Sequence, residues 1–103
     1  MKVYWANVEF DIMTPAAWED CVGGFVYLFF KASDVLEAIP KIREALKAED
    51  LSLTAIEFIT PYELMPWTDD EEREHYDGLA REAAAGTQIV WDEIEAYESR
   101  DDA

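Results

Sequence analysis

KVYWANVEFDI, residues 2–12, alternates between two kinds of side chain along its whole length. On an extended chain, one side carries the apolar set Tyr4, Ala6, Val8, Phe10 and Ile12, and the other side carries Val3, Trp5, Asn7, Glu9 and Asp11. Period-two alternation of this kind is typical of a strand with one buried face. The stretch therefore predicts a strand that packs against a core on one side.

The chain after this strand alternates between apolar strands and amphipathic helices. Phe25–Phe30 is apolar on both faces and rich in β-forming residues, which predicts an interior strand. Residues 51–60 predict a third strand, with Ile56 and Phe58 on the same face. Thr87–Glu98 predicts a last strand.

Three segments carry helix signals. Thr14 followed by Pro15 predicts a short helical turn that ends at Gly23 or Gly24. Residues 34–48 have an apolar stripe behind a possible cap at Ser33 or Asp34, and predict a helix. A second helix is predicted from a capping box, Thr68-Asp69-Asp70-Glu71, to Gly86, with its own apolar stripe (Tyr76, Leu79, Ala80 and Ala83).

These elements predict an α+β fold. Because each helix has a single apolar face, we expect a two-layer sandwich: a mostly antiparallel sheet of four to five strands, with both main helices on one face. If YELMPW, residues 62–67, supplies a weak strand, the stretch from Phe25 to Tyr97 can form a ferredoxin-like βαββαβ unit with residues 2–12 as an extra N-terminal strand. We expect one domain over residues 1–98 and a frayed acidic tail over residues 99–103.

The chain is strongly acidic, with 24 acids and 8 bases in 103 residues and a formal net charge of −16. That charge opposes binding to nucleic acid or to an anionic membrane, and it favours basic partners or simply solubility. The single cysteine, Cys21, cannot form an internal disulfide, which suits a reducing compartment. Since no signal-peptide pattern or long apolar run is present, we expect a cytoplasmic protein.

If both helices cover one side of the sheet, the other side presents aromatic rings among carboxylates. This predicted surface is the candidate binding site and consists of Trp5, Asn7, Glu9, Asp11, Glu57, Trp91, Glu93, Glu95 and Tyr97. Isolated charges are costly to bury, and Trp and Tyr are enriched at binding hot spots. A face of this composition suits a surface that is exposed to solvent in the monomer and is covered when a partner binds.

A purely structural interpretation competes with binding. Trp5 and Trp91 can cover each other as a cross-strand pair, and Lys or Arg stems can neutralise the acids. If the first and last strands are neighbours, Glu9 and Glu93 crowd together with the other carboxylates, which raises their pKa values or attracts a cation.

Other motifs carry little chemistry. Glu71, Glu72 and His75 match half of a di-iron carboxylate motif, but the second half is missing, so a solvated His75 in an acidic first turn is the simpler interpretation. Two acids precede Cys21 and disfavour a nucleophilic thiolate there. We therefore predict no cofactor, no metal ligands and no catalytic residue.

The sequence predicts a small, acidic, non-catalytic protein-interaction module. Its partner is a second copy in a homo-oligomer or a basic protein. The alternative is a small enzyme or ligand-binding domain that uses carboxylates of the same face as bases or as oxygen ligands to a divalent metal.

Overall fold

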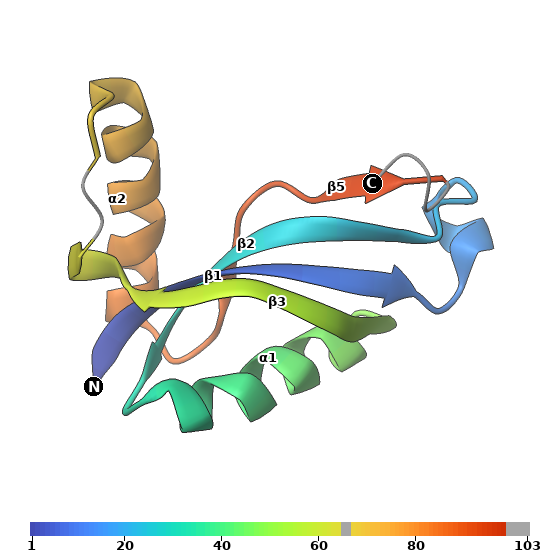
Figure 1. The fold of residues 1–103 in the computed structure, drawn as a ribbon, viewed down its shortest axis with the longest axis horizontal. Helices are drawn as coiled ribbons and strands as arrows, with labels where there is room; N and C mark the ends of the chain where they lie inside the picture. The colour runs from blue at the N-terminus through green and yellow to red at the C-terminus, as the bar shows by residue number, and fades with distance from the viewer. Residues whose placement is uncertain (65–66, 99–103) are drawn as a thin grey trace.

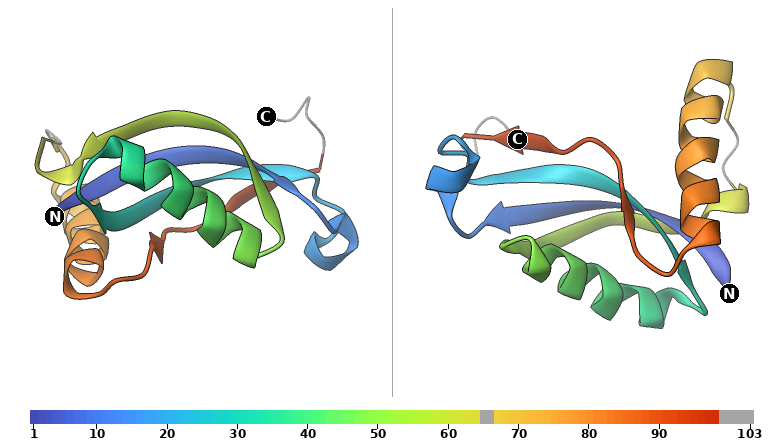
Figure 2. Two further views of the ribbon diagram at one scale, coloured as in Figure 1. Left: turned by 90° about the horizontal axis from the view of Figure 1, so that it is seen from below. Right: turned by 180° about the vertical axis from the view of Figure 1, so that it is seen from behind.

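The computed structural model, which describes residues 1–64 and 67–98, contains a curved antiparallel sheet and two α-helices (Figures 1 and 2). The strands are β1 (Lys2–Ile12), β2 (Gly23–Ala32), β3 (Leu51–Pro61), β4 (Val90–Trp91) and β5 (Glu95–Tyr97). The helices are α1 (Val35–Ala48) and α2 (Asp70–Ala85), with short 3-10 helices η1 (Pro15–Trp18) and η2 (Tyr62–Leu64). The predicted α+β class and antiparallel sheet are confirmed.

The strand order is β3-β1-β2-β4, and β5 also pairs with β2. The two strands in the middle, β1 and β2, are the ones with the clearest sequence signals. β1 pairs with β2 along ten consecutive residue pairs, from Lys2 opposite Ala32 to Asp11 opposite Gly23. This register places the odd-numbered residues of both strands on one face and the even-numbered residues on the other.

Helix α1 covers the even-numbered face. The predicted apolar set of β1 is buried there together with Val26, Leu28, Phe30 and Ala32 of β2 and with Ala38, Ile42 and Leu46 of α1. Asp34 caps the helix, because its side chain accepts a hydrogen bond from the backbone N–H of Glu37 at 2.9 Å. The sheet and α1 form the predicted two-layer packing.

Helix α2 lies on the other face of the sheet, so the expectation that both helices share one face is wrong. Its stripe, Tyr76, Leu79, Ala80 and Ala83, packs against the odd-numbered Trp5 and Phe29. β2 is apolar on both faces and therefore needs a cover on each side. α2 crosses only one end of the sheet (Figure 1), which leaves the rest of this face without a helix.

Two β-bulges change the faces predicted for β3. Phe58 lies opposite Asn7, whereas Ile56 lies opposite Val8, so Glu57 is an extra residue between the two pairs. As a result Ile56 packs on the α1 side and Phe58 on the α2 side, and the prediction that they share one face is wrong.

The predicted last strand is broken into two short strands. Between them Asp92 leaves the ladder, and its backbone N–H donates to the carbonyl of Tyr27 at 3.0 Å. The break changes the alternation: Trp91 packs with the α1 core, whereas Glu95 lies opposite Phe25 on the odd-numbered face. A single strand from Thr87 to Glu98 would have placed Trp91 and Glu95 on the same side.

The capping residues follow the sequence signals with local changes. The turn after Thr14 forms as predicted but ends at Glu19, and both glycines belong to β2. Asp69 rather than Thr68 caps α2, and that helix ends before Gly86 as predicted.

In the YELMPW segment, Tyr62–Leu64 is a 3-10 helix and residues 65–66 lie outside the described residues. The strand required by the ferredoxin-like alternative is therefore not found among those that are described.

Gly23 is required where β2 pairs with β5, because it lies opposite Tyr97. A Cβ at this position would lie 2.6 Å from the Tyr97 hydroxyl oxygen and 2.7 Å from the Phe10 carbonyl oxygen. By contrast, a Cβ on Gly78, inside α2, meets no atom within 4 Å.

The two glycines therefore give a matched pair of substitutions. Gly23→Ala should lower the free energy of unfolding by about 1–3 kcal/mol, because the backbone of β1 and the Tyr97 ring must both move. Gly78→Ala should raise it by about 0.5–1 kcal/mol, because alanine is the better helix former. Urea unfolding measures both, and equal effects would contradict the close contact at Gly23.

Candidate functional site

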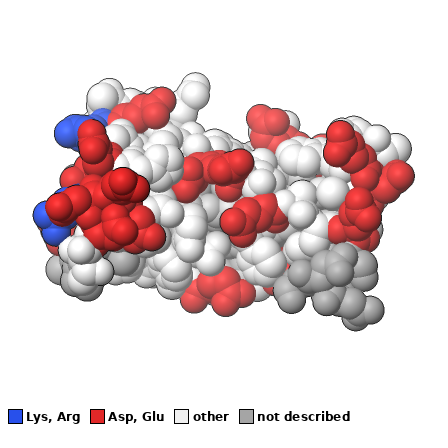
Figure 3. Space-filling view, turned by 90° about the horizontal axis from the view of Figure 1, so that it is seen from above, with Lys and Arg blue, Asp and Glu red and all other residues white. Residues whose placement is uncertain are grey.

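The part of the odd-numbered sheet face that α2 leaves uncovered is called the open face here. It carries Asn7, Glu9 and Asp11 from β1, Phe25 and Tyr27 from β2, and Glu95 and Tyr97 from β5. Viewed from this side, acidic side chains of the described residues are spread along the molecule, and the Lys and Arg side chains that are coloured lie at the α2 end (Figure 3). The described residues thus form an acidic surface with aromatic rings in its floor.

Neither predicted tryptophan belongs to the open face. Trp5 is only 5% exposed and lies beneath α2, where its ring stacks on Trp67 at 4.9 Å and on Tyr76 at 5.6 Å between centroids. Trp91 points to the α1 core on the opposite side. The predicted cross-strand pair of Trp5 and Trp91 is therefore wrong, because the two rings occupy different faces of the sheet.

Tyr97 links the last strand to the first. β2 separates β5 from β1, so these two strands are not neighbours. The Tyr97 side chain nevertheless passes over Gly23, which has no side chain, and its hydroxyl donates a hydrogen bond to Glu9 Oε2 at 2.7 Å. Burial and this hydrogen bond raise the pKa of Tyr97 to about 12. Tyr97 therefore holds the end of the open face together.

A hollow of about 340 Å³ lies where the open face meets α2. Asn7, Phe25, Val26 and Tyr27 contribute from β1 and β2, and His75 and Tyr76 contribute from α2. Asp92 and Glu93 come from the segment between β4 and β5, and Glu95 is the first residue of β5. No Lys or Arg side chain is among these lining residues. The hollow combines an aromatic floor with a wall of carboxylates.

His75 and Asp92 join the two walls of the hollow. His75 Nε2 lies 3.0 Å from Asp92 Oδ1, and the His75 side chain is 56% exposed whereas that of Asp92 is 14% exposed. Since an ionised carboxylate can only accept, Nε2 carries the proton of this bond and the Nδ1 lone pair of the neutral ring remains available. His75 is exposed, as the sequence suggested, but its contact with Asp92 was not predicted.

The electrostatic environment of the hollow is negative. Burial raises the pKa of Tyr76, and the charges of Asp92, Glu72 and Glu95 raise it further. Among residues 1–64 and 67–98, Glu93 and Glu95 have no ion-pair partner. The one Lys or Arg ion pair in that part of the chain is Lys2–Glu63, and Asp92 has its hydrogen bond to His75. Lys or Arg stems within the described chain therefore do not neutralise this wall.

The structure brings together part of the predicted candidate site. Asn7, Glu9, Asp11, Glu95 and Tyr97 share the open face, Glu93 lines the hollow, and Glu57 is exposed in the bulge of β3. Sequence reasoning missed His75, Asp92, Tyr76, Tyr27 and Phe25 as lining residues. The two-sided apolar run of β2 was the available signal for Phe25 and Tyr27, whereas the pairing of His75 with Asp92 depends on the placement of α2.

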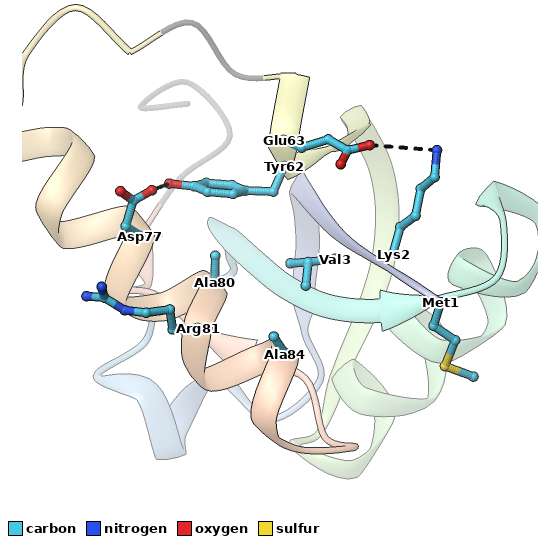
Figure 4. A pocket seen from close by; sticks show the side chains of 9 residues that line it. All are labelled: Met1, Lys2, Val3, Tyr62, Glu63, Asp77, Ala80, Arg81 and Ala84. Carbon is cyan, nitrogen blue, oxygen red and sulfur yellow. Dashed lines mark hydrogen bonds and ion pairs between the residues drawn. The ribbon is translucent and has the colours of Figure 1, made fainter.

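A larger cavity of about 500 Å³ lies on the other side of α2, beside the start of β1 (Figure 4). Val3, Ala80 and Ala84 line it, and Tyr62 spans it with a short hydrogen bond to Asp77. Burial and that bond raise the pKa of Tyr62 to about 12. We place the candidate site in the smaller hollow, because the polar groups of Tyr62 and Asp77 already satisfy each other in the larger one.

No group of three or more His, Cys, Asp or Glu side chains among the described residues could hold a metal ion. No helix formed by those residues is long and apolar enough to cross a membrane.

Comparisons of the chain with protein-family models, with curated proteins and with solved structures gave no significant match. The geometry of the open face is therefore the basis for a functional proposal.

Tyr97 and Tyr62 predict a loss of stability at high pH. Their folded-state pKa values of about 12 lie above the ordinary tyrosine value of 10.0. Their contribution to stability is therefore full below pH 10 and is lost as the pH rises towards 12. Tyr97→Phe should also lower the free energy of unfolding at neutral pH by about 1–3 kcal/mol, because the hydrogen bond to a carboxylate is removed.

Urea unfolding between neutral pH and pH 11 tests this assignment. The wild-type protein should lose stability above pH 10, and the double variant Tyr62→Phe/Tyr97→Phe should lose less over the same interval. An equal decline in both proteins would show that other groups control the alkaline transition.

Proposed function

We propose that the protein is a cytoplasmic, non-catalytic interaction module whose open face binds a basic protein. The observation that carries the proposal is the hollow at the α2 end of this face, where carboxylates and aromatic rings come together without a Lys or Arg side chain. Basic partners complement such a surface electrostatically, and aromatic side chains supply contact area. The lack of an internal disulfide suits a reducing compartment.

Charge favours a basic protein over a second copy. A homodimer through this face would bring Glu93 and Glu95 of one copy against the same carboxylates of the other, in a chain whose net charge is −16. Like charges placed together cost free energy, whereas a basic partner gains from the same field. Self-association through the open face is therefore the weaker form of the proposal.

The proposal predicts that association with a basic peptide depends on salt. With a short peptide that mixes arginine and lysine as the probe, the association rate should fall about tenfold or more between low and physiological ionic strength, because screening removes the attraction. Stopped-flow fluorescence of the labelled peptide measures the rate.

Two double variants separate the open face from the charge of the whole chain. Glu93→Gln/Glu95→Gln removes two charges beside the hollow, and Glu44→Gln/Glu49→Gln removes two exposed charges at helix α1 and its C-cap. The first should slow association more than the second. Equal effects, or a rate that does not change with salt, would count against binding at the open face.

The His75–Asp92 contact favours one second candidate, a small enzyme that uses His75 as a general base. A carboxylate that holds an imidazole in one tautomer is a common arrangement in acid–base catalysis, and His75 borders a hollow of about 340 Å³. The divalent-metal form of the alternative has no support among the described residues.

Chemical modification tests this second candidate without a known substrate. If Asp92 activates the ring, diethyl pyrocarbonate should acylate His75 faster than it acylates free N-acetylhistidine at the same pH, and Asp92→Asn should remove the difference. Mass spectrometry follows the reaction, and a His75 that reacts more slowly than the free compound would exclude an activated base.

A further inference from the structure

We propose that the hollow receives an arginine side chain of the basic partner. This inference rests on the proposed function and names the chemical group that the open face recognises. The site is a hollow with walls, not a flat charged surface. Its floor comes from β1 and β2, one wall comes from α2, and the other wall comes from β5 and the segment before it.

The aromatic part of the hollow suits a planar cation. The rings of Tyr27 and Tyr76 are 6.0 Å apart between centroids and nearly perpendicular, at 80°. Both side chains are partly exposed and both line the hollow. A guanidinium group can lie against a ring face, where the negative charge of the π system attracts it, and it gives up its hydration more readily than an ammonium group does.

The polar part of the hollow suits several N–H donors at once. Glu93 and Glu95 carry carboxylates on one side, and the Asn7 side chain offers an amide oxygen from the floor. The guanidinium group has five N–H donors in a fixed plane and can bind a carboxylate through two parallel hydrogen bonds. A lysine ammonium is also attracted to a ring face, but as a compact point charge it neither stacks flat on the ring nor forms two parallel hydrogen bonds to one carboxylate.

The carboxylates that make the hollow negative are not neutralised by basic side chains of the described residues. Asp92 is occupied by His75, but its charge and that of Glu95 still act on Tyr76. Among the described residues, the Glu93 and Glu95 carboxylates have no hydrogen-bond or ion-pair partner. A cation in the hollow would therefore meet carboxylates that are open to binding.

The test compares two peptides of equal length and charge, one with arginine and one with lysine at every basic position. The arginine peptide should bind at least about threefold more tightly, which is the difference expected from ring stacking and a paired carboxylate contact. Isothermal titration calorimetry gives both dissociation constants. In amide NMR spectra, the largest shifts with the arginine peptide should fall on Tyr27, His75 and Asp92.

Two variants locate the preference. Asn7→Phe keeps the net charge but fills the hollow, so it should remove the preference for arginine while leaving the affinity for the lysine peptide within about twofold. Glu44→Gln/Glu49→Gln, on the α1 side, should keep the preference. Both variants are first compared with the wild-type protein by circular dichroism and urea unfolding.

Each outcome bears on one of the two proposals. Equal binding of the two peptides with shifts over the open face would overturn the arginine pocket and leave the basic-partner proposal standing. Binding that prefers arginine but survives Asn7→Phe would place the arginine elsewhere and overturn the inference. Absence of binding by either peptide at low salt would overturn the proposed function as well.

Discussion

The packing of Trp5 beneath α2 decides how the rest of the molecule is arranged. Its ring lies within 6.3 Å, centroid to centroid, of six other aromatic rings contributed by β2, β3, η2, α2 and the segment before α2. Burying a side chain of this size contributes several kcal/mol, so α2 is held at that end of the sheet. Once α2 is there, the odd-numbered face is divided into a covered end and the open face.

The same division explains why aromatic rings and carboxylates occur together on one side of β1. Up to Trp5 the odd-numbered side chains serve a second core, and from Asn7 onward they are polar. A strand that changes its environment half-way along its length has no single periodic pattern on that face. Trp5 and Glu9 are therefore parts of two different surfaces that share one strand.

Local sequence signals predicted most of the elements but not their arrangement. The alternation in residues 2–12, the cap at Asp34 and the stop at Gly86 depend on neighbouring residues, and each agrees with the structure. The side of the sheet that α2 covers depends on contacts far apart in the chain. The apolar character of both faces of β2 was the one available signal that both faces of the sheet are covered. The apolar stripe of a helix does not indicate which face of the sheet that helix packs against.

Irregularities of the backbone were the second feature of the fold that could not be predicted from the sequence. The bulge at Glu57 and the break at Asp92 each shift the alternation by one residue, so Ile56 and Phe58 lie on different faces, as do Trp91 and Glu95. No residue type marks either position. Trp91 was assigned to the wrong side for this reason, and the contact of Asp92 with His75 was missed.

Two groups of acidic residues in this chain have different physical roles. Asp69 accepts two backbone N–H groups at the start of α2, and Asp70, Glu71 and Glu72 lie in the first turn, where the helix dipole favours negative charge. Those carboxylates stabilise the helix whether or not a partner exists. Glu93 and Glu95 have no such helix to stabilise, and they stand next to partly exposed rings at the edge of a hollow.

An uncovered sheet surface of this kind costs stability in the isolated chain, because like charges repel and the rings of Phe25 and Tyr27 remain partly wet. The proposed cationic partner would reverse both effects at once, since it would neutralise the carboxylates and cover the rings. Relief of the charge repulsion and burial of the rings at the open face would thus both contribute to the free energy of binding.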